Sequence, residues 1–155
     1  MFDVISQSTK NIYLCFFLNL MKKDIQIPKV KDVYIVAIRE WNDDFMENSW
    51  YAYLLNDTDE QLDLAMIVSR AYGILDGEER KTTTFRHAFK EVAPKTAIKI
   101  ELLENNVLQL NNEFMLSYFI NNELFDKKFT FEANSIIESA LTDLPAIPRT
   151  GIFAR

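Results

Sequence analysis

The one histidine of the chain, His87, is the residue type most often used for acid and base chemistry near neutral pH. It lies between Phe85 and Phe89 in an alternating stretch, so its side chain shares their face. A general base needs a nucleophile or substrate within hydrogen-bond reach and a group that orients the imidazole. No motif spacing supplies either, so we predict a histidine at the edge of the core with a polar neighbour, and no catalytic residue. A cleft that gathered His87 with several acids would instead indicate chemistry.

Carboxylates gather in three predicted loops, and calcium is the cation that prefers such oxygen ligands. The candidate metal ligands are Asp57, Asp59, Asp63 and Asp76. The other acids of these loops are Asp43, Asp44, Glu47, Glu60, Glu78 and Glu79. The EF-hand pattern fails, because Leu62 stands where glycine is required and Val68 where the bidentate glutamate belongs. Solvated turns that keep strand edges soluble are the alternative to a calcium site.

Large aromatic side chains are the remaining candidates for a binding groove, for example for a sugar or a peptide. They are Trp41, Trp50, Tyr51, Tyr53, Tyr72 and Tyr118. Packing in a core is the default role of such residues. The chain has only three glycines and contains no Walker loop, no dinucleotide-binding glycine pattern and no Gly-x-Ser-x-Gly elbow. We therefore predict no cofactor and neither a nucleotide-dependent nor a classical hydrolase mechanism.

Composition narrows the class of protein further. The chain has 155 residues, 48% of them hydrophobic, and a formal net charge of −6. This length fits one domain with one core. The negative charge opposes binding to phosphate backbones, and no basic run is longer than a pair, so we expect neither a nucleic-acid nor a membrane partner. The single cysteine, Cys15, excludes an intrachain disulfide and, with one histidine, a zinc site rich in Cys or His. A cytoplasmic location fits this usage.

The N-terminal stretch needs separate treatment. Residues Asn11–Leu20 form an apolar run of the length of a signal-peptide core, too short to span a bilayer. The charge ahead of the run and the residues after it do not fit a signal peptide, although an exported protein is the alternative if the run belongs to one. Met21–Ile25 has the character of a polypeptide start. We predict that residues 1–20 are an extension from a misassigned start codon and that residues 21–155 form the single domain.

The elements that must position these residues are predicted to be strands. Val33–Arg39 is apolar on both faces, which fits a strand covered on two sides. Glu40–Asn48 is an acidic connection in which Trp41 and Phe45 have helical spacing. Residues 50–55 and 62–72 are predicted to pair as a β-hairpin, with Leu62, Leu64, Met66 and Val68 on one face.

The second half of the chain continues the pattern. Further strands are predicted over residues 82–92, 98–102, 107–110, 114–120 and 124–133. Asp76-Gly77 and Asn121-Asn122 have turn chemistry. In the strand of residues 98–102, Lys99 and Glu101 fall on the wet face. Ser135–Glu138 matches a capping box and predicts a short helix that ends by Pro145, followed by an irregular tail or a final edge strand.

Strands separated by turns, without alternating helices, predict an all-β protein. We expect an antiparallel β-sandwich of about seven to eight strands with a short C-terminal helix. The alternative is a single sheet with helical pieces on one face.

Four segments resemble a group of short bacterial proteins of unknown function: Met21–Ile25, Val30–Val33, Leu102–Phe114 and Phe125–Phe129. The resemblance covers residues 21–155 and leaves residues 1–20 outside. Some members of the group are labelled as the alpha subunit of phenylalanyl-tRNA synthetase. A synthetase of that class needs a large sheet whose motif arginines hold ATP and a surface for tRNA, for which this short acidic chain has no room. The resemblance implies no functional residue.

These features together predict a non-catalytic binding or assembly module with a protein partner or a second copy of itself. Its apolar strands would leave an edge or a face free for that contact. The alternatives are an accessory protein linked to phenylalanyl-tRNA synthetase, which rests on the label alone, and a calcium-dependent binding module that uses the acidic loops.

Overall fold

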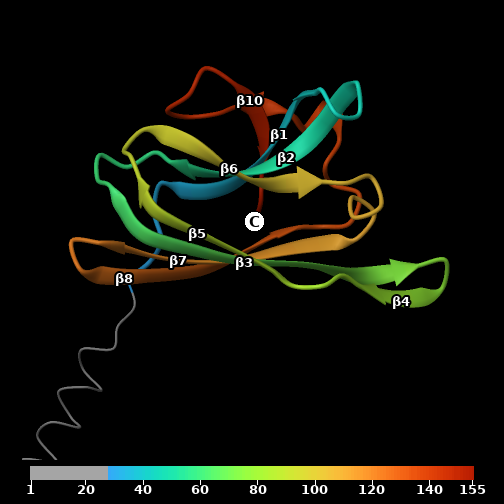
Figure 1. The fold of residues 1–155 in the computed structure, drawn as a ribbon, viewed down its shortest axis with the longest axis horizontal. Helices are drawn as coiled ribbons and strands as arrows, with labels where there is room; N and C mark the ends of the chain where they lie inside the picture. The colour runs from blue at the N-terminus through green and yellow to red at the C-terminus, as the bar shows by residue number, and fades with distance from the viewer. Residues whose placement is uncertain (1–27) are drawn as a thin grey trace, which may run out of the picture.

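The computed structural model describes residues 28–155, so the predicted extension over residues 1–20 and Cys15 lie outside the described residues. The described part is all-β, with ten strands in two antiparallel sheets that pack face to face (Figure 1). The prediction of an all-β fold with two antiparallel sheets is confirmed. The predicted number of seven to eight strands is too low, because short strands flank the long ones at three places.

The first sheet has the strand order β6-β2-β1-β10-β9. Its strands are β1 (Val33–Asn42), β2 (Glu47–Asn56), β6 (Thr96–Leu103), β9 (Thr142–Asp143) and β10 (Thr150–Phe153). The second sheet has the order β4-β3-β7-β8, and β5 pairs with the first half of β3. Its strands are β3 (Leu62–Leu75), β4 (Glu78–Lys81), β5 (Phe85–Val92), β7 (Asn111–Ile120) and β8 (Glu123–Phe131).

The core lies between the sheets. Phe114 of β7 and Phe131 of β8 meet edge to face at 6.0 Å between ring centroids, and both are fully buried. Leu54 from the first sheet and Ile67 from the second belong to the same cluster. As predicted, β1 is buried on both faces, because Ile38 on its outer side packs in a second, smaller cluster with Leu144.

Two hairpin turns follow the predicted turn chemistry. Asp76 and Gly77 both have positive φ, 53° and 78°, and join β3 to β4. Asn121 and Asn122 have φ of 50° and 63° and join β7 to β8 through the pair Ile120 and Glu123. Two successive residues with positive φ fit the right-handed twist of a hairpin, which is why Asn and Gly occupy these positions.

The predicted hairpin between residues 50–55 and 62–72 is wrong, because β2 and β3 belong to opposite sheets. The chain crosses between the sheets after Asn56, whose side chain is fully buried. The side-chain amide nitrogen of Asn56 donates to the backbone carbonyl oxygens of Glu60 (2.8 Å) and Ala93 (3.1 Å). Its side-chain oxygen accepts from the backbone amide of Thr58 (3.0 Å). These bonds hold the crossover from the first sheet to the second, where the sequence predicted a turn between two paired strands.

The predicted C-terminal helix is also wrong, since only a single 3₁₀ turn, Glu138–Ala140, forms there. Ile136 packs in the main core and Leu144 in the outer cluster, on opposite faces of the first sheet. One helix cannot reach both, so the chain runs extended around the sheet. The tail forms β10, which lies between β1 and β9 and is not an edge strand. Residues 107–110, predicted as a strand, form a turn.

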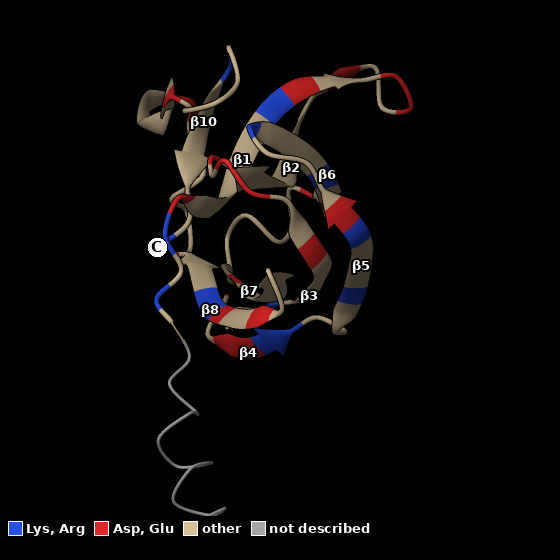
Figure 2. Cartoon of the chain, turned by 90° about the vertical axis from the view of Figure 1, so that its left-hand side faces the viewer, with Lys and Arg blue, Asp and Glu red and all other residues tan. Residues whose placement is uncertain are grey.

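The sheets meet along two seams, visible end-on in Figure 2. At the first seam, the Arg155 backbone exchanges two hydrogen bonds with Thr130 of β8, at 2.7 and 2.9 Å, while Ala154 donates to Ile35 of β1. At the second seam, β5 and β6 lie side by side as the edge strands of opposite sheets. We call these the β8 seam and the β5–β6 seam.

Candidate functional site

A bulge in β3 decides which of its side chains face the interior. The pairing with β7 slips by one residue between Asp63 and Met66, and Leu64 within the slip has a positive φ of 48°. A one-residue slip exchanges the two faces of a strand. Ile67 and Ser69 therefore point inward, whereas Met66 is 56% exposed. The predicted face that combines Leu62 with Leu64, Met66 and Val68 is wrong beyond Leu62.

A second bulge, in β6, turns Glu101 inward. Ala52 of β2 pairs with Glu101 and the next residue, Tyr53, pairs with Lys99, so Ile100 is the extra residue. Glu101 therefore shares the inner face of Ala52, a core residue. The predicted position of Glu101 on the wet face beside Lys99 is wrong for this reason. Bulges commonly re-aim one side chain in this way next to functional sites.

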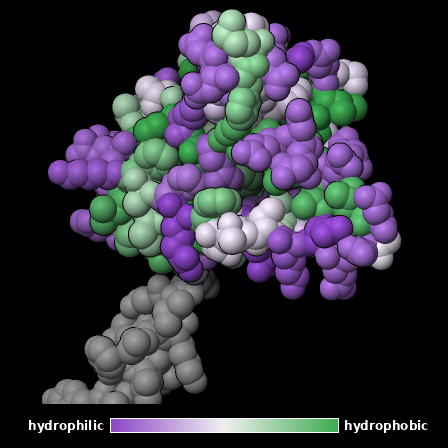
Figure 3. All heavy atoms as spheres, turned by 45° about the vertical axis from the view of Figure 1, so that its right-hand side comes forward, coloured by the Kyte–Doolittle hydropathy of each residue, from purple (hydrophilic) through white to green (hydrophobic). Residues whose placement is uncertain are grey.

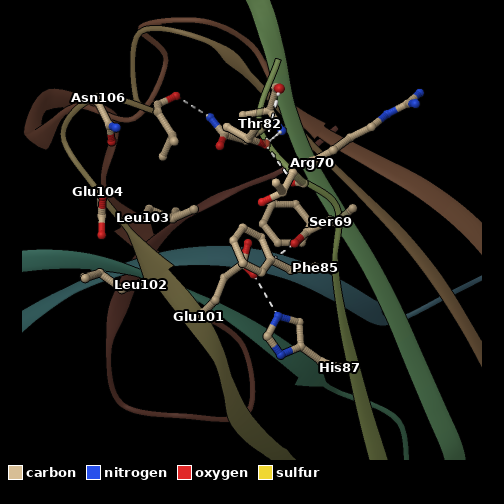
Figure 4. Close-up of a pocket in the computed structure, with 15 residues that line it drawn as sticks. Ser69, Arg70, Thr82, Phe85, His87, Glu101, Leu102, Leu103, Glu104 and Asn106 are labelled. Atoms are coloured by element: carbon tan, nitrogen blue, oxygen red, sulfur yellow. Dashed lines mark hydrogen bonds and ion pairs between the residues drawn. The ribbon is translucent and has the colours of Figure 1, made fainter. Parts of the chain in front are cut away.

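Three polar side chains meet at the β5–β6 seam as a result (Figure 4). Glu101 Oε2 accepts a hydrogen bond from Ser69 Oγ at 2.9 Å and another from His87 Nε2 at 2.8 Å. Because a carboxylate only accepts, Nε2 is the protonated ring nitrogen. Ser69 is 2% exposed, and the side chains of Glu101 and His87 are 19% and 25% exposed. His87 thus lies at the edge of the core with a polar partner, as predicted.

These residues line a cavity of about 380 Å³ that opens at the seam. Its other walls are largely apolar and include Phe85, Leu103, Val107 and Phe114. Phe114 belongs to the core, while Phe85 is 54% exposed at the mouth. The side of the molecule brought forward in Figure 3 shows hydrophobic residues that reach the surface among hydrophilic ones.

Hydrogen bonds fix two walls of the cavity. The side-chain amide of Asn112 donates to the backbone carbonyl oxygens of Val107 (2.8 Å) and Leu110 (3.0 Å), and these bonds hold the turn after β6. On the opposite wall, the Ala71 amide donates to Thr82 Oγ1 at 2.9 Å and the Thr82 amide donates to the Ala71 carbonyl at 2.9 Å. Both walls are therefore built before any ligand enters, as is usual for small-molecule sites.

The geometry is not that of a nucleophile with its base. Ser69 donates its hydroxyl proton to the carboxylate, and within residues 28–155 it makes no hydrogen bond to His87. A serine nucleophile requires a base that takes its proton and is itself oriented by a third group. Here the carboxylate is the shared acceptor of both neighbours. Its second oxygen, Oε1, receives no hydrogen bond from the described residues, and because no buried side-chain oxygen among them lacks a partner, Oε1 is open to solvent and to a ligand.

The predicted metal candidates lie outside the lining of this cavity, and of the four only Asp57 and Asp59 lie close together, with a lysine between them. Asp57 and Asp59 flank the Lys95 ammonium, at 3.0 and 3.9 Å. Asp63 accepts from the Gln61 side chain, and Asp76 lies in the turn at the far end of the same strand, roughly 40 Å away at about 3.3 Å per residue. Among residues 28–155, no group of three or more His, Cys, Asp or Glu side chains is placed to hold a metal ion.

The candidate aromatic residues do not form one groove. Trp50 and Tyr118 are core residues, and Trp41 is exposed in the β1–β2 hairpin. Tyr53 lies on the outer face of the first sheet, where its hydroxyl donates to Glu40 at 2.8 Å. Trp41 and Phe45, predicted to pack on one turn of helix, are both exposed in a β-hairpin.

Glu40 is the centre of a charged cluster on this outer face. Arg149 donates to it at 2.8 Å, and Lys99 forms an ion pair with its other oxygen. Burial alone would raise the pKa of Glu40, but the hydrogen bonds from Lys99, Arg149 and Tyr53 together lower it. This cluster ties β6 to β1 and β2 from the outside of the first sheet.

No known family model matches the chain, and no curated protein matches it. The resemblance described from residues 102–114 and the other three segments therefore stays a prediction. No helix that could cross a bilayer occurs among residues 28–155. Function is accordingly inferred from the geometry of the β5–β6 seam.

Proposed function

We propose that this protein is a non-catalytic binding module that holds a small, largely apolar ligand in the cavity at the β5–β6 seam. The observation that carries the proposal is Glu101, a carboxylate turned inward by a bulge at the wall of an apolar cavity of about 380 Å³. Sites for small molecules have roughly 300–1,000 Å³ and a few polar groups that fix orientation. The cavity has a volume in this range, and its apolar walls carry a few polar groups.

Binding is favoured over catalysis by how the polar groups are paired. Within the cavity, His87 meets one inward acid, Glu101, while Glu104 is exposed at the rim. Ser69 and His87 both give their protons to the same oxygen, so neither activates the other. An apolar wall with one free acceptor positions a ligand but supplies no second group to transform it.

The test is thermal unfolding with 2-phenylethanol as a neutral probe. Binding to the folded state raises the free energy of unfolding by RT ln(1 + [L]/Kd), about 1.4 kcal/mol at ten times Kd, which raises Tm by a few degrees. Val107→Trp fills the cavity, and Thr83→Trp blocks it from the exposed rim if the first variant folds poorly. We expect the rise for the wild type and its loss in a folded variant. An equal rise in both, or none in the wild type, contradicts the proposal.

A second candidate function, contact with a protein partner, is favoured by the outer face of the second sheet. The register places two rows side by side, Arg86–Val68–Met115–Lys128 and Ala88–Met66–Ser117–Asp126. Met66 and Met115 are exposed at their centre. Arg86 and Lys128 stand on opposite margins, and Asp126 is the one acid of the two rows. Because cations outnumber acids in these rows, an apolar surface with acidic margins fits this face better than a second copy of it does.

Synthetic peptides test this second function. A strand of alternating leucine and glutamate should bind, and the same strand with lysine in place of glutamate should not. Met115→Asp should abolish binding of the acidic peptide without affecting 2-phenylethanol. Equal binding of the two peptides, or binding of neither, contradicts it.

A further inference from the structure

We propose that the ligand of the β5–β6 cavity is an ammonium compound with a compact apolar body. This inference rests on the proposed function, because it names the chemical class that the same site would take. It is carried by the free oxygen of Glu101 and by the absence of a competing cation that points into the cavity among the described residues.

The charge inside the cavity is negative and incompletely neutralised. Ser69 and His87 both donate to Oε2 of Glu101, and Oε1 is left without a donor from residues 28–155. Arg70 also borders the cavity, but its guanidinium pairs with Glu113 at 3.1 Å, and Figure 4 shows its side chain directed away from Glu101. A second carboxylate, Glu104, stands at the rim. An anionic ligand would therefore meet carboxylates, whereas an ammonium group would meet a free acceptor.

The rest of the cavity selects the body of the ligand. Leu103, Val107 and Phe114 form apolar walls, and the exposed ring of Phe85 stands at the mouth. Aromatic faces attract cations as well as apolar groups, so Phe85 can accompany an ammonium group on its way to Glu101. A strongly hydrated polyamine or metal ion would leave these apolar walls unused. A single ammonium group on an aryl or branched alkyl body uses both.

The bulge in β6 is the reason why Glu101 faces the cavity. A regular strand would have turned Glu101 to the outer face with Lys99, where water would solvate it without cost. Holding a carboxylate at 19% exposure against apolar walls costs solvation, which two hydrogen bonds offset only at one oxygen. The other oxygen is open to solvent, and an ammonium ligand would take the place of water there.

The experiment is calorimetric titration of the wild-type protein at pH 7.5 with three probes of similar size: 2-phenylethylamine, 2-phenylethanol and phenylacetate. A charge-assisted hydrogen bond contributes more than a neutral one, so we expect the amine to bind about tenfold more tightly than the alcohol and phenylacetate to bind more weakly than either. Glu101→Gln keeps an acceptor for Ser69 and His87 and removes the charge. In this variant the amine and the alcohol should bind equally.

Glu91→Gln is the matched control, because it makes the same charge change at an exposed position of β5 outside the cavity. It should leave the tenfold preference intact. Equal binding of amine and alcohol to the wild type would overturn the ammonium inference and leave the proposed small-ligand function standing. Binding of none of the probes would overturn both. A preference for the amine that persists in Glu101→Gln, with alcohol binding unchanged, would also overturn the inference, because the charge would then be recognised elsewhere.

Discussion

The two seams of the molecule are closed by different means. At the β8 seam, backbone hydrogen bonds between Arg155 and Thr130 join the C-terminal segment to β8, and the rings of Phe129 and Phe131 fill the space behind them. At the β5–β6 seam, the sheets touch through the side chains of His87 and Glu101 instead. A cavity of about 370 Å³ borders the β8 seam as well, with Thr130, Phe131 and Arg155 in its lining. The difference between the seams is therefore how they are joined: one by backbone pairing and apolar packing, the other by polar side chains that include an inward carboxylate.

The β5–β6 seam is the place where the fold is less stable than it could be. Apolar packing at the β5–β6 seam would stabilise the fold without the desolvation of a carboxylate, and Phe131 shows that the chain uses such packing elsewhere. The β5–β6 seam is also closed at one end only. There the Asn56 side chain holds the carbonyl oxygen of Ala93 in the turn between β5 and β6, while the other end opens at Phe85. The polar, open end is therefore the part suited to binding.

The largest expected effect compares the same substitution at the two seams. Phe131→Ala should lower the free energy of unfolding by about 3–5 kcal/mol, because Phe131 is 1% exposed and its removal leaves a cavity against Phe114. Phe85→Ala should cost about 1 kcal/mol or less, since this ring is 54% exposed. Urea denaturation of both variants measures the difference. Equal losses would show that the β5–β6 seam is packed as tightly as the β8 seam.

The next effect concerns the closed end of the β5–β6 seam. Asn56→Ala should destabilise the protein by about 2–3 kcal/mol, because it leaves the buried Val92 carbonyl and the partly buried Glu60 and Ala93 carbonyls without their side-chain partner. Asn105→Ala, at an exposed turn position, is the matched control and should change stability by less than about 0.5 kcal/mol. Urea denaturation again gives both values. A loss below 1 kcal/mol for Asn56→Ala would mean that the crossover is held by something else.

A smaller effect is expected from the cluster that holds β6 from outside. The pKa of Glu40 is lowered in the folded state, so its contribution to stability is complete above the ordinary value of 4.5 and is lost as the pH falls through the lower folded-state value. Glu40→Gln should cost about 1–2 kcal/mol at pH 7 and should flatten the fall in stability at acid pH. Denaturant midpoints at several pH values measure this. An unchanged pH profile in Glu40→Gln would contradict the assignment.

The smallest effect on stability should come from Glu101. Glu101→Gln is expected to change the free energy of unfolding by less than about 1 kcal/mol, because lost attraction to His87 is offset by a lower cost of desolvation. Measured at pH 7 beside Phe131→Ala, this separates a residue kept for binding from one kept for packing. A loss of more than 3 kcal/mol would mark Glu101 as structural.

How much of the fold and of the candidate site the sequence predicts depends on how local each sequence signal is. The turns at Asp76-Gly77 and Asn121-Asn122 were predictable because positive φ at two adjacent residues is a local demand that Asn, Asp and Gly meet. The two buried faces of β1 were predictable for a similar reason, since its run of Val and Ile leaves no polar side.

The candidate site was not predictable beyond His87. Ser69 and Glu101 reach the cavity only because bulges in β3 and β6 exchange the faces of those strands. A bulge at Leu64 or Ile100 has no glycine to announce it and depends on the pairing with β7 and β2. The sheet assignment of β2 and β3 failed likewise, because Asp57–Glu60 looks like a hairpin loop until buried Asn56 is seen to hold a crossover.

Amide chemical-shift mapping by NMR with 2-phenylethylamine tests directly whether the open end of the β5–β6 seam is a binding site. We predict that the shifts concentrate at Ser69, Phe85, His87, Glu101 and Val107, which come from β3, β5, β6 and the turn after β6 and all line this cavity. Shifts confined to the outer face around Met66 and Met115, or spread evenly over the molecule, would show that this cavity is not the binding site.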